Sequence, residues 1–277
     1  MRFDEARPID RVVSDLRALG VARGDFLILH SSFKSLGLSE GSPADVIASI
    51  LEALGPQGTV MVPTFAYCFA GRWDRLAYHP DRTPCRHNGI ITEMLRQWPG
   101  AHRSGHPTHS VAAVGRFADE VTRDKEHASP LGTGSSFQDA LGLDARILLL
   151  GVGNNRNSML HYAEVAAELP YNNVPFRAFL GRTALVDRDG RVEEIALVHE
   201  FPGCSENFGV ADAYLDARGL LTHGKVAQAD CMLMDSRPVV DALVERLRED
   251  PSWLLCDRFT CEACTLRKRR LRAEGLI

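Results

Sequence analysis

The sequence predicts an α/β protein, because short runs of apolar residues alternate along the chain with segments of helical periodicity. The clearest run, residues 147–150, is wholly apolar and is stopped by Gly151 and Gly153, as expected of a buried central strand. A polar turn over residues 154–157 follows, and helical spacing begins at Ser158. The central feature of the chain is therefore a strand that leads through a polar loop into a helix, which is a common place for functional residues.

The N-terminal part repeats the alternation of helix and strand. Ser42 and Pro43 provide an N-cap and a first-turn proline for its second helix, and Gly55 ends that helix. The expected elements are a helix over 9–19 closed by Gly20, a strand over 26–29, a helix from Pro43 to Leu54, and a strand over 58–62.

Residues 65–88 show little periodicity and carry Trp73, Tyr78 and His79, so we expect a long excursion of the kind that is often functional. The later elements are expected to be a helix over 89–98, a polar loop and strand over 103–115, a short helix ending at Leu141, a hairpin over 178–200, a helix over 206–217, a strand over 224–234 and a helix over 239–247.

Length and composition favour one domain over residues 1–250, followed by an extension over 251–277. The chain has 277 residues, which can bury a large core, and no linker or repeat divides it. A net charge of −4 gives no general attraction to nucleic acid or membrane. The N-terminus lacks an apolar signal region and no run approaches a membrane span, so a cytoplasmic location is expected.

The cysteines are concentrated toward the C-terminus. The odd count of seven without a secretory signal argues against a disulfide framework. Cys261 and Cys264 form a CxxC pair that, with Cys256 and Cys204, is compatible with a structural zinc site, although a single CxxC is weak support. The basic run that begins at Arg267 is interpreted as a solvated helix face.

His161 and Glu164 lie three residues apart in the helix that starts at Ser158, so their side chains share a face. A carboxylate beside an imidazole fixes its tautomer and raises its basicity, which makes His161 a candidate general base. An ordinary surface pair is the alternative. Metal binding would need further ligands, and no His or Cys lies nearby at ligand spacing, so no metal is expected at this site.

Two loops could contact a ligand. Residues 30–37 are rich in hydroxyls and follow a strand, at the edge where open α/β sheets usually bind ligands. Residues 129–136 are rich in Gly, Ser and Thr and could cradle a phosphate. They fit neither common phosphate-binding pattern, so we interpret them as mainly structural.

Several motifs occur in one order over residues 9–247. They are HSSFKSLG (30–37), GTVMVPT (58–64), RSGHPTHSVAAVG (103–115), SPLG (129–132), LLLGVGNNRNSMLHYAE (148–164) and GKVAQADCMLMDSRPVVD (224–241). This series resembles the aminoglycoside 3-N-acetyltransferase family of acetyl-CoA-dependent enzymes. The resemblance implies a three-layer α/β/α sandwich and direct transfer of acetyl from coenzyme A to an amine.

The resemblance also implies roles for individual residues. His161 matches the family's catalytic histidine, Glu164 the acid that orients it, and Ser158 a position where threonine is common and a hydroxyl can stabilise an oxyanion. The residues expected to bind acetyl-CoA are His30, Ser31, Ser32, Ser35, Thr64, Arg103, Ser110 and Val111.

The acceptor implied by the resemblance is a small-molecule amine, first an aminoglycoside and alternatively an amino sugar, an amino-sugar nucleotide or another biosynthetic amine. The basic, Cys-containing tail lies outside the resemblance and leaves room for the second class, whose phosphates would attract arginines. A homodimer is one alternative for the oligomeric state. Acids that could attract a polycation, although each could equally be an ordinary surface acid, are Asp74, Asp81, Glu168, Glu206 and Asp212.

Overall fold

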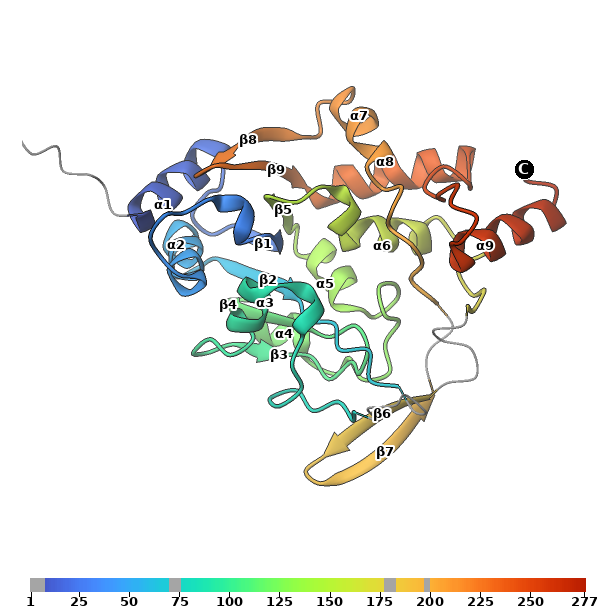
Figure 1. Cartoon of the computed structure of the whole chain (residues 1–277), viewed down its shortest axis with the longest axis horizontal. Coiled ribbons are helices and arrows are strands. Elements are labelled where there is room, and N and C mark those ends of the chain that lie inside the picture. Colours follow the sequence, from blue (N-terminus) through green and yellow to red (C-terminus); the bar gives the residue numbers. More distant parts are fainter. Residues whose placement is uncertain (1–7, 70–75, 177–182, 197–199) are drawn as a thin grey trace, which may run out of the picture.

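The computed structural model describes residues 8–69, 76–176, 183–196 and 200–277. Its main feature is a mixed seven-stranded sheet in the order β3-β4-β2-β1-β5-β9-β8 (Figure 1). The strands are β1 Phe26–Ser31, β2 Thr59–Pro63, β3 His102–Arg103, β4 Val111–Gly115, β5 Arg146–Leu150, β8 Thr222–Val226 and β9 Ala229–Asp235.

The three central strands are parallel. β1 pairs with β2 on one side and with β5 on the other, with Leu27 opposite Val60 and His30 opposite Leu149. The outer pairings of β4 with β2 and of β9 with β5 are antiparallel. The carboxyl ends of β1, β2 and β5 therefore meet at one edge of the sheet, where open α/β sheets place ligands.

Helices cover both faces of the sheet. Successive residues of β5 point to opposite faces: Ile147 and Leu149 join one buried cluster, and Leu148 and Leu150 join the other. The helices on the second face are α1 Pro8–Leu19, α2 Pro43–Leu54 and α3 Ile90–Leu95. Those on the first face are α4 Ala118–Thr122, α5 Ser136–Gly142, α6 Ser158–Ala166, α7 Val210–Asp216, α8 Ser236–Glu249 and α9 Glu262–Ala273. The expected three-layer α/β/α sandwich is confirmed.

The N-cap predicted at Ser42 is present. Its hydroxyl accepts from the backbone of Asp45, and the Asp45 carboxylate accepts in return from the backbone N–H of Ser42 at 2.7 Å. α2 ends where Gly55 takes a positive φ of 66°. The start and the end predicted for this helix are therefore both confirmed.

The strand expected over residues 224–234 is wrong as a single element. Two antiparallel strands, β8 and β9, occupy this stretch, with Val226 opposite Ala229 across the turn. Ala227 lies in the turn with a φ of 51°, a conformation that alanine seldom adopts. The helix expected over residues 206–217 is also shorter, because α7 spans Val210–Asp216.

A two-stranded hairpin, β6 Thr183–Arg188 and β7 Arg191–Ala196, projects from the main sheet (Figure 1). It confirms the hairpin expected around residues 187–190, while residues 178–182 and 197–199 of that prediction lie outside the described residues. The excursion over residues 65–88 forms isolated bridges to this hairpin through Phe69 and Tyr78. Trp73 falls outside the described residues. Wherever the chain is described, each of its helices is too short or too polar to cross a bilayer.

Candidate active site

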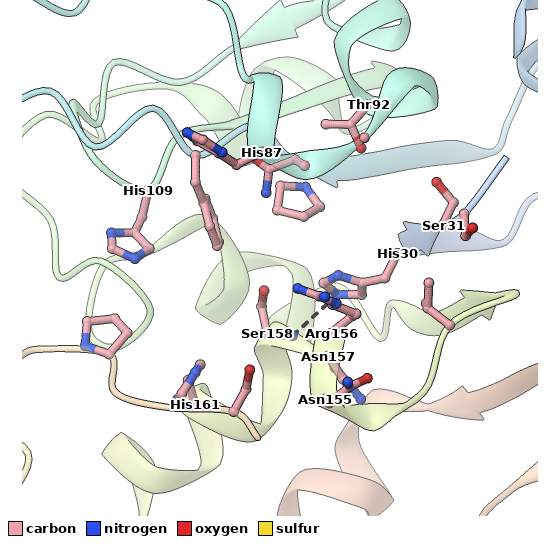
Figure 2. Close-up of a pocket in the computed structure, with 18 of the residues that line it drawn as sticks. His30, Ser31, His87, Thr92, His109, Asn155, Arg156, Asn157, Ser158 and His161 are labelled. Atoms are coloured by element: carbon pink, nitrogen blue, oxygen red, sulfur yellow. Dashed lines mark hydrogen bonds between the residues drawn. The ribbon is translucent and has the colours of Figure 1, made fainter. Parts of the chain in front are cut away.

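A cavity of about 1010 Å³ opens at the edge where β1, β2 and β5 end. His30 and Ser31 reach it from β1, Pro63 from β2, and Gly151 from the turn after β5. Figure 2 shows Ser158, His161 and His109 around one end of this cavity and Ser31 and Thr92 at the other. The cavity is thus built by the strand–loop–helix units that the sequence indicates.

Gly151 allows the chain to turn at the end of β5. Its φ is +70°, and a Cβ at this position would lie 2.6 Å from the Cβ of Ser35. A side chain here would be strained and would push into the loop after β1. The backbone N–H of Ser32 donates to the carbonyl of Leu150 at 2.9 Å, which keeps the two loops side by side.

Two buried asparagines fix the start of α6. The Asn157 side chain caps the helix by accepting from the Met159 backbone N–H at 3.0 Å, and its amide donates to Asn154 Oδ1 at 2.8 Å. The next backbone N–H, that of Ser158, points at His30 Nε2 at 3.4 Å (Figure 2). The helix N-terminus, with its partial positive charge, therefore faces the cavity.

His161 lies one turn into α6 and lines the cavity. Its Nδ1 lies 2.7 Å from Glu164 Oε2, and its ring packs at an angle against Phe208 with centroids 4.6 Å apart. The His161 side chain is 12% exposed and that of Glu164 only 2%, so the surface-pair alternative does not describe this contact. Because Nδ1 faces the carboxylate, Nε2 is the ring nitrogen available to a substrate.

Glu164 is held by two further groups, one from the distant helix α9 and one from just beyond the end of α6. Arg267 of α9 donates to Glu164 Oε1 at 3.0 Å, and the Tyr171 hydroxyl donates to the same oxygen at 3.3 Å. Burial on its own raises the pKa of Glu164, but the charge of Arg267 and the hydrogen bonds from His161 and Tyr171 outweigh it, and the pKa lies below its ordinary value. Glu164 is therefore ionised at neutral pH.

Arg267 contradicts the interpretation of the basic run as a solvated face. Its side chain is 3% exposed, its guanidinium lies 4.7 Å from the Tyr171 ring centroid, and it also donates to the carbonyl of Phe201 at 2.6 Å. The later basic residues Arg269, Arg270 and Arg272 are exposed, as expected. Nothing in the local sequence distinguishes Arg267 from them.

Two other histidines in the lining are kept neutral. Burial lowers the pKa of His30 to about 3. Burial, together with the neighbouring His106 and His161, holds the pKa of His109 well below its ordinary value. His109 accepts or donates at 2.9 Å to the Thr108 hydroxyl and lies against Phe65, with centroids 4.6 Å apart. His109 was not among the residues expected in the site, although it lies within the polar loop and strand predicted over residues 103–115.

The residues expected to bind acetyl-CoA separate into two groups. His30, Ser31 and Ser32 line the cavity. The remaining five are not part of the lining: Ser35, Thr64, Arg103, Ser110 and Val111.

Within this second group, Ser35 is exposed, and its hydroxyl donates to that of Ser32 at 2.8 Å. Thr64, Ser110 and Val111 are fully buried. Arg103 donates to the Thr64 carbonyl at 2.8 Å and to the Pro80 carbonyl at 2.9 Å. Arg103 thereby fastens the excursion to the end of β2, so its observed contacts are structural.

No aspartate or glutamate appears among the described residues that line the cavity, whereas Lys34 and Arg156 do. The acids that were candidates for attracting a polycation lie elsewhere. Asp212 accepts from Asn154 at 2.7 Å, and Glu206 pairs with Arg258 at 2.9 Å. Asp81 and Glu168 are exposed and not part of the lining, and Asp74 lies outside the described residues.

Cys204, Cys256, Cys261 and Cys264 come together beside α9. Their sulfurs all lie within 4.8 Å of one another. They belong to a different site from the cavity, because none of the four is part of its described lining.

Comparison with known proteins agrees with this geometry. The family model described as aminoglycoside 3-N-acetyltransferase matches residues 28–248. The chain is 32% identical over 241 residues to aminoglycoside N(3)-acetyltransferase IV of a Salmonella species, covering 87% of each protein. It is 31% identical over 264 residues to aminoglycoside N(3)-acetyltransferase VII of Streptomyces paromomycinus, covering 86% of this chain and 91% of the relative.

Solved structures agree with the sequence comparison. A histidine-to-alanine mutant of aminoglycoside acetyltransferase AAC(3)-IVa, in complex with a gentamicin, matches with a TM-score of 0.83 and 30% identity, covering 98% of this chain and 99% of that one. The apoenzyme of AAC(3)-IVa matches with a TM-score of 0.82 over 95% of this chain and 96% of that one. The chain belongs to the aminoglycoside 3-N-acetyltransferase family.

Proposed function

We propose that this protein transfers the acetyl group of acetyl-CoA directly to an amine of an aminoglycoside, with His161 as the general base. The observation that carries the proposal is the 2.7 Å contact between His161 Nδ1 and the buried Glu164 carboxylate at the wall of a large cavity. Membership of the family supports the reaction class. The relative in complex with a gentamicin supports the class of acceptor.

An amine that is protonated near neutral pH must first lose one proton to solvent, because only the neutral form has the lone pair that can attack a thioester. As the neutral nitrogen bonds to the acetyl carbon, His161 Nε2 takes a second proton from it, and Glu164 stabilises the resulting imidazolium. General-base catalysis contributes roughly 10²- to 10⁴-fold. The reaction is direct, without an acyl-enzyme. The described lining contains no cysteine whose thiol could carry the acetyl group.

The tetrahedral intermediate carries negative charge on the former carbonyl oxygen. The Ser158 hydroxyl, at the positive end of α6, and backbone N–H groups of the loop after β1 are the proposed donors to this oxygen. When the intermediate collapses, the C–S bond breaks and the thiol of coenzyme A leaves with the proton that His161 holds. Products are the N-acetylated amine and free coenzyme A.

Coenzyme A is proposed to lie along His30, Ser31 and Ser32, with Lys34 and Arg156 available for its phosphates. Ser35 supports this wall by its hydrogen bond to Ser32. The other residues of the set expected from the resemblance act one layer behind, by fixing the end of β2 and the start of β4. They are Thr64, Arg103, Ser110 and Val111.

The test is the release of free thiol from acetyl-CoA with gentamicin- or kanamycin-type acceptors. His161→Ala should lower kcat by roughly 10²- to 10⁴-fold, because the amine proton loses its acceptor, while coenzyme A still binds. The matched control is His223→Ala, since His223 also contacts a carboxylate, Asp216, at 2.7 Å but lies 54% exposed. Near wild-type turnover by His161→Ala would rule out the general-base role.

A second candidate is transfer to an amino-sugar nucleotide or another biosynthetic amine. The observation that favours it is that the described lining holds no carboxylate. A polycationic drug therefore meets no opposite charge on the described wall, whereas an acceptor with phosphates of its own does not need one. Higher kcat/KM with amino-sugar nucleotides than with aminoglycosides would favour this candidate.

A further inference from the structure

The cysteine cluster joins three segments that are far apart in sequence. Cys204 lies in the loop before α7, Cys256 in the loop after α8, and Cys261 and Cys264 at the first turn of α9. Cys256 and Cys264 are buried, and the other two are half-buried. Four thiols from three segments that meet at one point indicate that they share a ligand.

The donor set and its spacing fit zinc. Thiolates are the preferred ligands of structural zinc sites, and four Zn–S bonds of about 2.3 Å in a tetrahedron place the sulfurs about 3.8 Å apart. The Cys204 and Cys256 sulfurs lie 3.9 Å apart, and all four lie within 4.8 Å. A disulfide requires about 2.05 Å, so the arrangement suits a bridging ion better than paired oxidation.

The same cluster lies beside the groups that hold Arg267. Arg267 follows Cys264 by one helical turn on the buried face of α9. Phe201, which accepts from Arg267 at 2.6 Å, and Gly203, where a Cβ would lie 2.6 Å from the guanidinium, both precede Cys204. A ligand that joins Cys204 to Cys264 therefore holds the segment of residues 201–203 against α9, which carries Arg267.

We infer that the four cysteines bind one structural zinc ion, and that this ion holds Arg267 against Glu164 and so positions the His161 imidazole. The second half of the inference rests on the proposed function, whereas the zinc site does not. All four ligands come from the protein, so the site is closed and the ion has no open position for chemistry. Arg267 is a positioning residue, since it acts through Glu164.

The first test measures metal in the full-length protein by elemental analysis, without reference to any acceptor. About one zinc per chain is expected in the wild type. Cys264→Ser should lose the ion. Cys204→His should keep it, because three cysteines and a histidine also form a structural site and Cys204 is half-buried. Cys231→Ser is the control, since Cys231 is buried in β9 outside the cluster.

A wild-type protein that contains no zinc and gains no thermal stability from added zinc would overturn the site. So would native mass spectrometry that shows the four cysteines in two disulfides. If zinc is present but no amine is acetylated, the site stands and the proposed function fails. The two failures are therefore distinguishable.

The second test separates positioning from folding through Arg267→Met. This variant should keep its zinc while kcat falls by roughly tenfold or more, with little change in the KM for acetyl-CoA. The groups that hydrogen-bond to the Glu164 carboxylate are His161, Tyr171 and Arg267, and the titratable Glu200 lines the same small cavity. Without Arg267, burial raises the pKa of Glu164, so the acidic limb of the kcat profile should move to higher pH. An unchanged profile in a folded, zinc-loaded variant would overturn the positioning role.

Discussion

At the scale of single residues, the site depends on compensation between buried charges. Glu164 is 2% exposed and Arg267 3%, so each would be costly without the other. Glu164 has two carboxylate oxygens and uses them for different partners: Oε2 faces His161, and Oε1 faces Arg267 and Tyr171. The arrangement leaves the carboxylate ionised while its charge still reaches the imidazole.

Glu164→Gln should lower kcat, but by less than His161→Ala does. Glutamine keeps the shape of the side chain but cannot stabilise an imidazolium by charge, and its amide can favour the wrong tautomer of His161. The pH profile should also change, because the ionised partner of His161 is gone. An unchanged rate and profile would contradict the role of Glu164.

Glu164→Gln also leaves Arg267 as a buried cation without its carboxylate, which should lower the free energy of unfolding by about 3–5 kcal/mol. A control must separate this loss of stability from the loss of catalysis. The double variant Glu164→Gln/Arg267→Met removes both charges. Thermal unfolding should show that the double variant is more stable than Glu164→Gln alone. Its kcat should remain low, which separates catalysis from stability.

At the scale of elements, local signals predicted most of the sheet and part of the site. The apolar run that becomes β5 and the spacing of His161 and Glu164 are local features, and both appear as expected. The turn between β8 and β9 could not be foreseen, because Ala227 replaces the glycine or asparagine that usually marks a positive φ. The Ala227 backbone N–H donates to the Asp15 carboxylate of α1 at 2.8 Å, which is a contact between segments far apart in the sequence.

Contacts between distant segments were equally hidden. Arg267 lies 103 residues from Glu164, and Arg269, Arg270 and Arg272 in the same basic run are exposed. His109 reaches the cavity only because β4 lies next to β2. Periodicity identifies which face of an element is buried, but not which element covers it.

α3 offers a test of how the excursion is attached beside the cavity. Glu93 accepts from the Cys85 backbone N–H at 2.8 Å and from Arg96 Nε at 3.0 Å. Burial alone raises the pKa of Glu93, but these hydrogen bonds and the Arg96 charge lower it to about 2, against an ordinary value of 4.5. The folded state therefore binds this proton less readily than the unfolded chain.

Glu93→Gln should lower the urea midpoint near neutral pH. The stabilisation by an ionised Glu93 is fully present above its ordinary pKa of 4.5 and is lost as pH falls toward the folded-state pKa of about 2. The difference in midpoint between wild type and variant should shrink at about pH 3. A difference that stays constant with pH would show that Glu93 acts by shape alone.

At the scale of the whole molecule, the C-terminal segment over residues 251–277 contributes a side chain to the site, because Arg267 donates to Glu164. α9 packs against the buried apolar cluster to which α6 contributes, and its Cys264 and Leu271 are part of that cluster. Lys268 donates to the Cys256 carbonyl at 2.9 Å, which ties the helix to the loop after α8. We therefore expect residues 251–277 to be required for turnover, even though the family model ends at residue 248.

Leu271→Ala tests this coupling, because Leu271 is fully buried and lies one turn beyond Arg267. The lost apolar contacts and the resulting cavity should cost about 2–5 kcal/mol, which weakens the docking of α9. Hydrogen exchange should then speed up first in α9, and kcat should fall because Arg267 is no longer held against Glu164. Leu276→Ala is the control, since Leu276 is 47% exposed and its loss should change stability by about 0.5 kcal/mol or less. If Leu271→Ala loosened α9 and left kcat intact, the C-terminal helix would be a stabilising cover and not a part of the catalytic apparatus.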